Sequence, residues 1–329
     1  GGLLFGYDTA VIAGAIDFLK QYFGLTPAQE GWAASSALVG CVMGTVAAGV
    51  MNDFLGRRKV LIVCAVRFVI SAIGSAFPDS QLVFVIFRIL GGVGVGAASM
   101  TSPLYIAEIS PAHIRGRMVS LNQLAIVFGM LAVYFVNYAI ARSGDEVWNT
   151  ETGWRWMFAS ETIPAVLLLA LLLLVPESPR WLVSRARSDE ALKILSRVNG
   201  RKSATQEVAT IKETIRQEGD RLSLILTRGM GVAMAIGITL AVLQQVTGIN
   251  VFLYYAPKIF KSLAGSRVDV AMLQTVVVGA VNLSFTIIAI WSVDRLGRRP
   301  LMMLGYSGMA ISLAALGGAT YFNRTEGWV

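Results

Sequence analysis

Apolar residues occur in long runs along this chain, and short polar stretches separate one run from the next. Most runs approach or exceed about 20 residues, the length that an α-helix needs to cross the hydrocarbon core of a bilayer. A longer polar stretch, residues 180–228, lies between the sixth run and the seventh. The pattern predicts nine membrane-spanning helices, at residues 1–19, 32–51, 60–77, 82–102, 119–141, 156–175, 229–260, 271–291 and 301–322.

The polar stretch itself contains apolar residues at helical spacing. They form two stripes, Ala191 with Leu195 and Val198, and Val208 with Ile211 and Ile215. Such stripes are typical of short amphipathic helices, which can rest with the apolar face at a membrane surface. We therefore expect two short helices here, lying against the membrane.

The composition agrees with a membrane protein. Hydrophobic residues make up 55% of the chain and charged residues only 15%, whereas soluble domains carry about 25% charged residues. Cys41 and Cys64 both fall inside predicted spans, so no disulfide framework is expected. No signal-peptide pattern is visible, and we expect the chain to be part of a longer protein. The fold class predicted is an all-α, polytopic membrane protein.

The net charge of +8 is explained by topology rather than by a nucleic-acid partner. Most of the 28 Lys and Arg residues lie in residues 180–228 or in the loops after the second, fourth and eighth predicted spans. The positive-inside rule places those loops in the cytoplasm. We therefore expect a multi-pass protein of the cell (inner) membrane, with the central loop and the termini of the full protein in the cytoplasm.

A repeated motif indicates two related halves. Asp53-Phe-Leu-Gly-Arg-Arg58 follows the second predicted span, and Asp294-Arg-Leu-Gly-Arg-Arg299 follows the eighth, six spans later. The same turn at equivalent places is typical of transporters built from parallel six-helix repeats. We expect an N-terminal transmembrane half at residues 1–180, a cytoplasmic loop at 181–228, and a truncated C-terminal half at 229–329.

Polar side chains cluster inside the seventh predicted span. Gln244, Gln245, Asn250 and Tyr254 lie there beside Gly248. Amides both donate and accept hydrogen bonds, so this cluster suits a neutral polyhydroxy ligand. The alternative is that the amides join neighbouring helices within the membrane. The glycine and a following proline, Pro257, weaken the helix, so we expect its backbone to open near them.

Several charges lie where lipid surrounds the chain. Asp8 and Arg88 fall in the first and fourth predicted spans, and a charge at the bilayer centre costs at least about 2.5–3.5 kcal/mol. They form either a proton site, in which Asp8 cycles between protonated and ionised, or a static salt bridge. Glu161 either joins this network or faces an aqueous cavity. Arg67 has no functional explanation.

The sequence does not favour enzyme chemistry. His113 is the only histidine, and it falls in a predicted cytoplasmic loop. No Cys or His spacing indicates a metal site, and we expect no cofactor. The glycine-rich run Gly91–Gly96 looks like a phosphate loop, but no Lys-Ser/Thr follows it and it lies inside a span. Close packing between helices explains it better.

Motifs along the whole chain resemble those of the sugar porter family of the major facilitator superfamily. Beyond the two repeated loops, they are GGLLFGYD at 1–8, PLYIAE at 103–108 leading to RGR at 115–117, PESPRWL at 176–182, QQ at 244–245 with GIN at 248–250, and YYAP at 254–257. The resemblance implies twelve helices in the whole protein, the last three being absent here.

The resemblance also implies import of a monosaccharide, a pentose or hexose of the D-xylose or D-glucose type, in symport with a proton. Proton-coupled members carry Asp at the position of Asp8, whereas animal facilitators carry Asn. A facilitative sugar uniporter and a non-transporting sugar receptor remain alternatives. Partners are the sugar, the proton and the lipid bilayer, with no nucleic acid, and a monomer is expected.

By resemblance, the sugar-binding residues come from both halves. They are Phe5, Gln123, Gln244, Gln245, Asn250, Tyr254 and Asn282. The resemblance implies glutamine at the position of Met130 for xylose transport, whereas facilitative glucose transporters carry an apolar residue there. Met130 therefore leaves the choice of sugar open.

The family further implies a latch of charges between the halves on the cytoplasmic side, closed when the cavity opens outward. Its residues are Arg57, Glu108, Arg115, Glu177, Arg180, Asp294 and Arg298. Judged from the residues alone, these could also be ordinary solvated charges that set topology, worth about 0–1 kcal/mol per pair.

Overall fold

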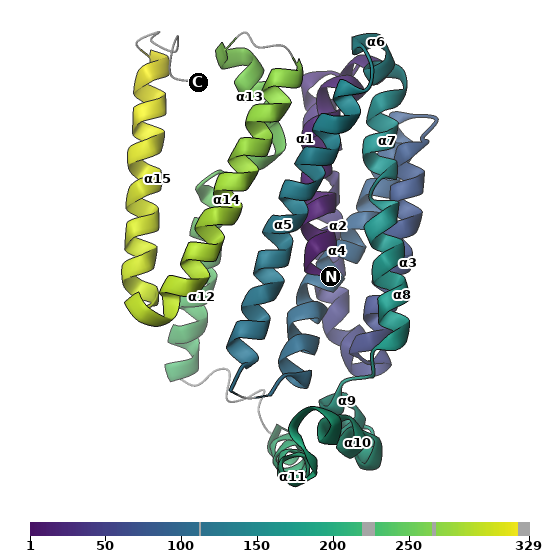
Figure 1. The fold of residues 1–329 in the computed structure, drawn as a ribbon, viewed down its shortest axis with the longest axis vertical. Helices are drawn as coiled ribbons and strands as arrows, with labels where there is room; N and C mark the ends of the chain where they lie inside the picture. Colours follow the sequence, from purple (N-terminus) through teal and green to yellow (C-terminus); the bar gives the residue numbers. More distant parts are fainter. Residues whose placement is uncertain (112, 219–227, 265–267, 322–329) are drawn as a thin grey trace.

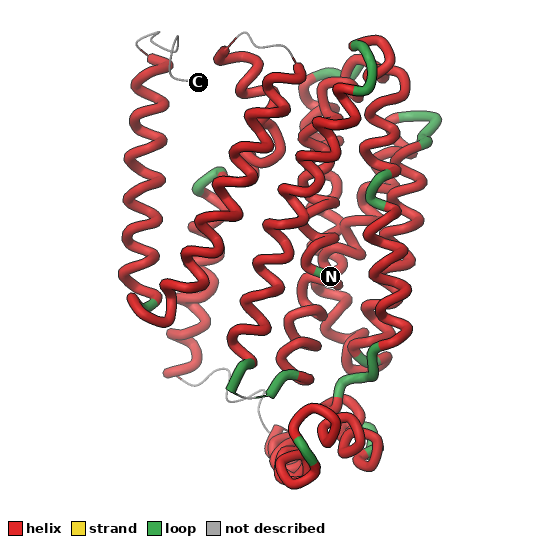
Figure 2. The backbone as a smooth tube through the Cα atoms, in the orientation of Figure 1, coloured by secondary structure: helices red, strands yellow, loops and turns green. Residues whose placement is uncertain are grey.

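The computed structural model describes residues 1–111, 113–218, 228–264 and 268–321, and this part of the chain contains helices and no strands (Figure 2). The first helices are α1 (Gly2–Phe23), α2 (Pro27–Leu55), α3 (Arg57–Ala76), α4 (Gln81–Ile109) and α5 (Arg115–Arg142). A short α6 (Glu146–Trp148) and a π-helical turn (Asn149–Gly153) lead to α7 (Trp154–Ala159) and α8 (Thr162–Leu174). The remaining helices are α9 (Pro179–Ser184), α10 (Ser188–Asn199), α11 (Arg201–Glu218), α12 (Arg228–Val246), α13 (Ile249–Ala264), α14 (Val268–Leu296) and α15 (Arg298–Tyr321).

The predicted membrane-protein fold is confirmed. In the described residues, eight helical stretches are long and apolar enough to cross a membrane. The ninth expected span corresponds to α15, which is 24 residues long. Two predicted spans are interrupted, and the break in the seventh was expected whereas the break in the sixth was not. The sixth breaks between α7 and α8, and the seventh breaks between α12 and α13, where Gly248 has φ of 76°. A left-handed φ is one that glycine adopts without steric cost, so the helix ends there.

Figure 1 shows two groups of upright helices and a third, smaller group beneath them. Helices α1–α8 form the N-terminal group, and α12–α15 form the C-terminal group beside it. The two groups meet mainly where α5 lies along α14 and where α1 lies along α13. We call the end that carries α9–α11 the inner end and the opposite end the outer end.

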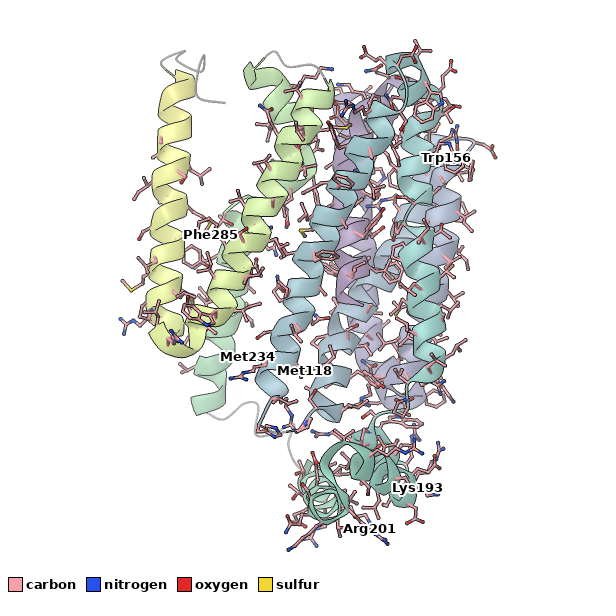
Figure 3. The ribbon with its side chains drawn as sticks, viewed as in Figure 1. Met118, Trp156, Lys193, Arg201, Met234 and Phe285 are labelled. Atoms are coloured by element: carbon pink, nitrogen blue, oxygen red, sulfur yellow. The ribbon has the colours of Figure 1, made fainter. Side chains whose placement is uncertain are left out.

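The three short helices at the inner end pack on one another. Trp181, Leu182, Leu195 and Val208 are all buried in one shared apolar cluster. The predicted short helices and their stripes are therefore confirmed, and the stripes pack on each other. That these helices lie at the membrane surface stays a prediction. Val198 does not belong to the buried stripe, since it is 44% exposed. Lys193 and Arg201 extend away from this cluster into solvent (Figure 3).

Glycines let α4 lie directly against α2. A Cβ added at Gly92 would overlap the carbonyl oxygen of Ala37, and one added at Gly96 would overlap that of Cys41. The backbones can approach this closely only because the side chain is a hydrogen atom. The interpretation of the glycine run as a packing surface is confirmed.

We expect Gly92→Val to destabilise the protein by at least about 1–3 kcal/mol, because overpacking forces the two backbones apart. The matched control is Gly49→Val on α2, since a Cβ at Gly49 meets no atom within 4 Å. Thermal unfolding in detergent, followed by tryptophan fluorescence, should show a lowered midpoint for Gly92→Val only. Equal midpoints for the two variants would contradict the packing role.

Candidate functional site

A buried ion pair lies at the centre of the N-terminal group. Arg88 on α4 and Asp8 on α1 are each only 1% exposed. Arg88 Nη1 donates to Asp8 Oδ1 at 2.6 Å, and Arg88 Nη2 donates to the Asp8 carbonyl oxygen at 3.3 Å. The guanidinium also lies 5.6 Å from the centre of the Phe158 ring, a favourable cation–π position. The two predicted intramembrane charges are therefore partners.

A second carboxyl group stands beside this pair. Glu161 is 1% exposed and lies at the break between α7 and α8, within hydrogen-bonding reach of Asp8 and in the field of Arg88. Its Oε1 has no hydrogen-bond partner among the described residues, and neither has Arg88 Nε. Two carboxyl groups thus lie close together beside one guanidinium, and they can hydrogen-bond to each other only when one carries a proton.

The break in the seventh span organises the amide cluster. Gln245 belongs to the end of α12 and Asn250 to the start of α13, and Asn250 Nδ2 donates to Gln245 Oε1 at 2.7 Å across the break. The prediction that the backbone opens near Gly248 is confirmed. Pro257 differs, because α13 continues through it. In an unbroken helix, Gln245 and Asn250, five residues apart, would not lie directly above one another. The break brings their two amide groups together.

An apolar layer with two tyrosines joins the two groups of helices above the amides. Tyr254 on α13 is 8% exposed and belongs to the same buried cluster as Met130 and Tyr134 of α5. Tyr134 Oη donates to the carbonyl oxygen of Leu253 at 3.0 Å. The predicted gate residue therefore lies in the apolar layer where the two groups meet.

The other predicted sugar-binding residues remain apart from this layer. Gln123, Gln244 and Gln245 are exposed, whereas Phe5 and Asn282 are partly buried. Among the described residues, neither Gln123 nor Asn282 hydrogen-bonds through its side chain to the other amides.

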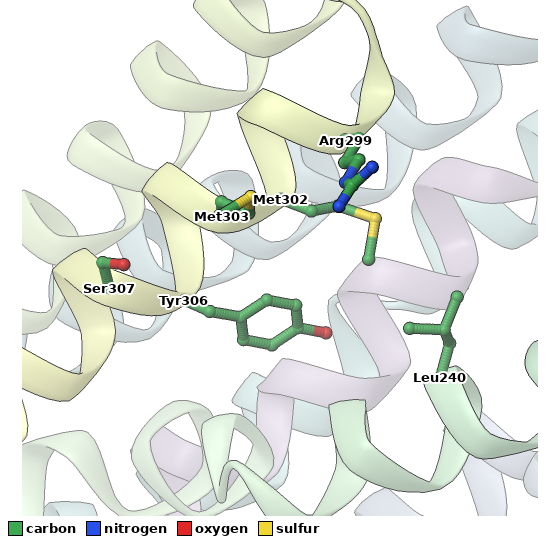
Figure 4. Close-up of a pocket in the computed structure, with 6 residues that line it drawn as sticks. All are labelled: Leu240, Arg299, Met302, Met303, Tyr306 and Ser307. Carbon is green, nitrogen blue, oxygen red and sulfur yellow. The ribbon is translucent and has the colours of Figure 1, made fainter.

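A cavity of about 580 Å³ lies elsewhere, between α12 and α15. Figure 4 shows its lining, which consists of Leu240, Arg299, Met302, Met303, Tyr306 and Ser307. None of the predicted sugar-binding residues lines it. Its surface is mostly apolar, so it does not match a polyhydroxy ligand.

The predicted latch residues at the inner end are bound mainly within the N-terminal group. Arg57 donates to Glu108 Oε1 at 2.9 Å, and the other Glu108 oxygen accepts a hydrogen bond from Ser178. Glu177 accepts from the backbone N–H groups of Arg58 and Ser178. These charges therefore anchor the segment after α8 to the ends of α2, α3 and α4.

The remaining latch residues differ in what the structure describes. Arg115 pairs with Glu207 of α11 at 3.8 Å, so it contacts the inner-end helices. Arg180 lines a polar cavity of about 540 Å³ with Arg57 and Glu108. The side chains of Asp294 and Arg298 lie outside the described residues. The latch between the halves thus stays a prediction.

Sequence reasoning missed several contacts near these sites. Tyr7 shares a hydrogen bond with Ser160 at 2.7 Å, one residue from Glu161. Arg58 closes the end of α8 by donating to the carbonyl oxygens of Leu172 and Leu173. The free carbonyl groups at the end of a helix attract cations. Arg58, which follows Gly56 in the repeated motif, was therefore the available signal for this contact.

Comparison with known proteins settles the family. A family model described as "Sugar (and other) transporter" matches residues 1–329. The chain belongs to this sugar transporter family. The transporter is 49% identical to the D-xylose-proton symporter of Escherichia coli (strain K12), over 98% of this chain and 70% of the relative. It is 44% identical to the arabinose-proton symporter of Bacillus subtilis (strain 168), over 99% of this chain and 70% of the relative.

Solved structures of the Escherichia coli xylose transporter XylE resemble the chain closely. A partially occluded inward-open conformation gives a TM-score of 0.88 at 46% identity, covering 98% of this chain and 78% of that one. A complex of the same symporter with 6-bromo-6-deoxy-D-glucose gives 0.87 at 47% identity, with coverage of 98% and 73%. The sugar porter resemblance and the major facilitator fold are therefore confirmed for this transporter.

Proposed function

We propose that this transporter imports a monosaccharide together with a proton by alternating access. The buried Asp8–Arg88 pair, 2.6 Å apart inside the membrane-spanning bundle, carries the proposal. Its membrane-spanning helices and its family support a multi-pass protein of the inner membrane. Both relatives described above are named as sugar–proton symporters, which agrees with transport rather than enzyme chemistry.

Coupling to a proton needs a group whose charge changes during the cycle. Asp8 is held by Arg88 when ionised, and protonation weakens that pair and releases the guanidinium. Glu161 stands beside both, so it offers Arg88 a second carboxylate partner when Asp8 is neutral. Proton binding can therefore change which arrangements of α1 and α4 are stable. The set Asp8, Arg88 and Glu161 is our proposed coupling site.

Sugar recognition is assigned to the amides and the aromatic residues around the break. Gln245 and Asn250 are held together across it, and Gln123 and Gln244 expose their amides. Phe5 supplies an apolar wall for the C–H face of a pyranose, Asn282 assists from α14, and Tyr254 gates the site. A pentose or a hexose fits this chemistry equally well.

Alternating access also requires interactions that hold one end of the transporter closed while the other end is open. We propose that Arg57, Glu108, Arg115, Glu177 and Arg180 belong to a latch that includes Asp294 and Arg298 of the C-terminal group. The N-terminal members support this, because Arg57, Glu108 and Glu177 already gather in one network at the inner end. A bias of a few kcal/mol is enough for such a switch.

Uptake into proteoliposomes tests the function directly. The reconstituted transporter is offered a panel of labelled sugars under an inward proton gradient, with and without a protonophore. Accumulation of one sugar that the protonophore abolishes is the expected result. Equilibration that ignores the protonophore would assign a facilitative uniporter, and binding without uptake would assign a receptor.

We expect Gln245→Ala to weaken sugar binding at least several-fold. Each amide–sugar hydrogen bond contributes about 0.5–1.5 kcal/mol, and the substitution also strands its partner Asn250. Isothermal titration calorimetry measures the affinity, with Gln206→Ala on the inner-end helix α11 as the matched control. An unchanged affinity in Gln245→Ala would remove this residue from the sugar site.

A further inference from the structure

Three charged side chains meet where the two groups of helices touch at the outer end. Glu30 lies in the first turn of α2 and is only 4% exposed. Its Oε2 pairs with Lys20 Nζ, at the end of α1, at 3.1 Å. Its Oε1 accepts a hydrogen bond from Lys258 Nζ on α13. One buried carboxylate thus joins the N-terminal group to the C-terminal group.

Each partner is held by its own group of helices. Thr26 and Gln29 form a capping box that fixes the first turn of α2, and Gln81 of α4 donates to the Gln29 carbonyl oxygen at 3.4 Å. Lys258 Nζ lies 5.9 Å from the centre of the Tyr255 ring, one turn earlier on α13. The distance between carboxylate and ammonium therefore depends on how closely α2 and α13 approach.

Two other features lie where the N-terminal group meets the C-terminal group. A small cavity between α1 and α13 is lined by Asp17 of one group and by Lys261 of the other, so an acidic and a basic side chain also border the same space there. The Tyr134–Leu253 hydrogen bond closes the layer below. Because α13 follows the break at Gly248, it can change its angle to α12 at that point.

We propose that Glu30 and Lys258 form an outer lock, a carboxylate–ammonium pair that holds the outer end closed and breaks when that end opens to admit sugar. This inference rests on the alternating access proposed above. The Glu30 side chain is 5% exposed, whereas that of Lys258 is 40% exposed, so water screens the pair less than it screens a surface pair. When the outer end opens, water hydrates both charges, but the hydrogen bond between Glu30 and Lys258 is lost.

Spin-label distances test the lock without requiring transport. Labels are placed at Asp79→Cys, between α3 and α4, and at Val270→Cys on α14, after Cys41 and Cys64 are replaced by serine. We expect Glu30→Gln and Lys258→Gln each to raise the ratio of open to closed distances roughly tenfold, as expected for a charge-assisted hydrogen bond. The control Lys20→Gln should shift it far less, because that bond lies inside the N-terminal group.

A double variant decides between a shared lock and two separate effects. If Glu30 and Lys258 act as one pair, the double variant should move the distances no further than either single variant does. Additive shifts, or unchanged distances in both single variants, would overturn the lock. The distances are recorded without sugar, so this test does not depend on transport. If the distances shift but the protein transports no sugar, the proposed function is overturned and the lock is retained.

Discussion

The variant Asp8→Asn is expected to bind sugar and exchange it across the membrane but to lose proton-driven accumulation. Asparagine resembles the protonated carboxyl group and cannot titrate, so the proton gradient has no group on which to act. The fold should tolerate the change because Arg88 keeps Glu161 as a neighbouring carboxylate. Asparagine also fits the same space on α1, where Asp8 is 1% exposed.

Two uptake measurements check this expectation in proteoliposomes. Counterflow of labelled sugar should stay within a few-fold of the wild-type rate in Asp8→Asn, while accumulation under an inward proton gradient should fall to the equilibrium level. A protonophore should reduce accumulation by the wild type and leave the variant unchanged. Asp79→Asn, an exposed loop carboxylate, is the control. If Asp8→Asn still accumulates sugar in a protonophore-sensitive manner, the coupling role passes to Glu161.

The pairing of Asp8 with Arg88 was accessible from the sequence because lipid makes an isolated charge costly. Two opposite charges inside predicted spans have few other ways to be satisfied. The break at Gly248 was accessible for a similar reason, since glycine lowers the stability of a helix locally. The break of the sixth span at Glu161 was missed, although the polar run Ser160-Glu161-Thr162 followed by Pro164 was a signal for it.

Charges near the helix ends were harder to interpret. Glu30 and Lys258 are 228 residues apart, and in the sequence both look like solvated residues at the rim of the membrane. Only the folded chain brings Lys20 of α1 and Lys258 of α13 to Glu30. The helices at the inner end were similarly hard to interpret. The sequence showed the apolar stripes of α10 and α11, but it did not show that these stripes pack on each other. Short amphipathic helices satisfy their apolar faces equally well on a membrane or on each other.

Replacing the guanidinium of the central pair should have the largest effect on stability. Arg88→Met is expected to lower the free energy of unfolding by about 3–5 kcal/mol, because it leaves a buried carboxylate without its counter-charge. Asp8 and Glu161 would then face each other in a site that is 1% exposed, and at least one of them must take up a proton to remain there.

A second substitution separates the lost charge from the lost volume. In Arg88→Met combined with Asp8→Asn, one carboxylate is removed together with the guanidinium, so we expect the double variant to unfold at a higher temperature than Arg88→Met alone. Arg67→Met on α3 is the matched control, since Arg67 forms no salt bridge with a described residue. Thermal unfolding in detergent measures all three. Only an electrostatic origin predicts that removing a second charged group increases stability. If Arg88→Met unfolds at the same temperature as the wild type, or if adding Asp8→Asn does not raise the midpoint of Arg88→Met, uncompensated charge does not govern this site.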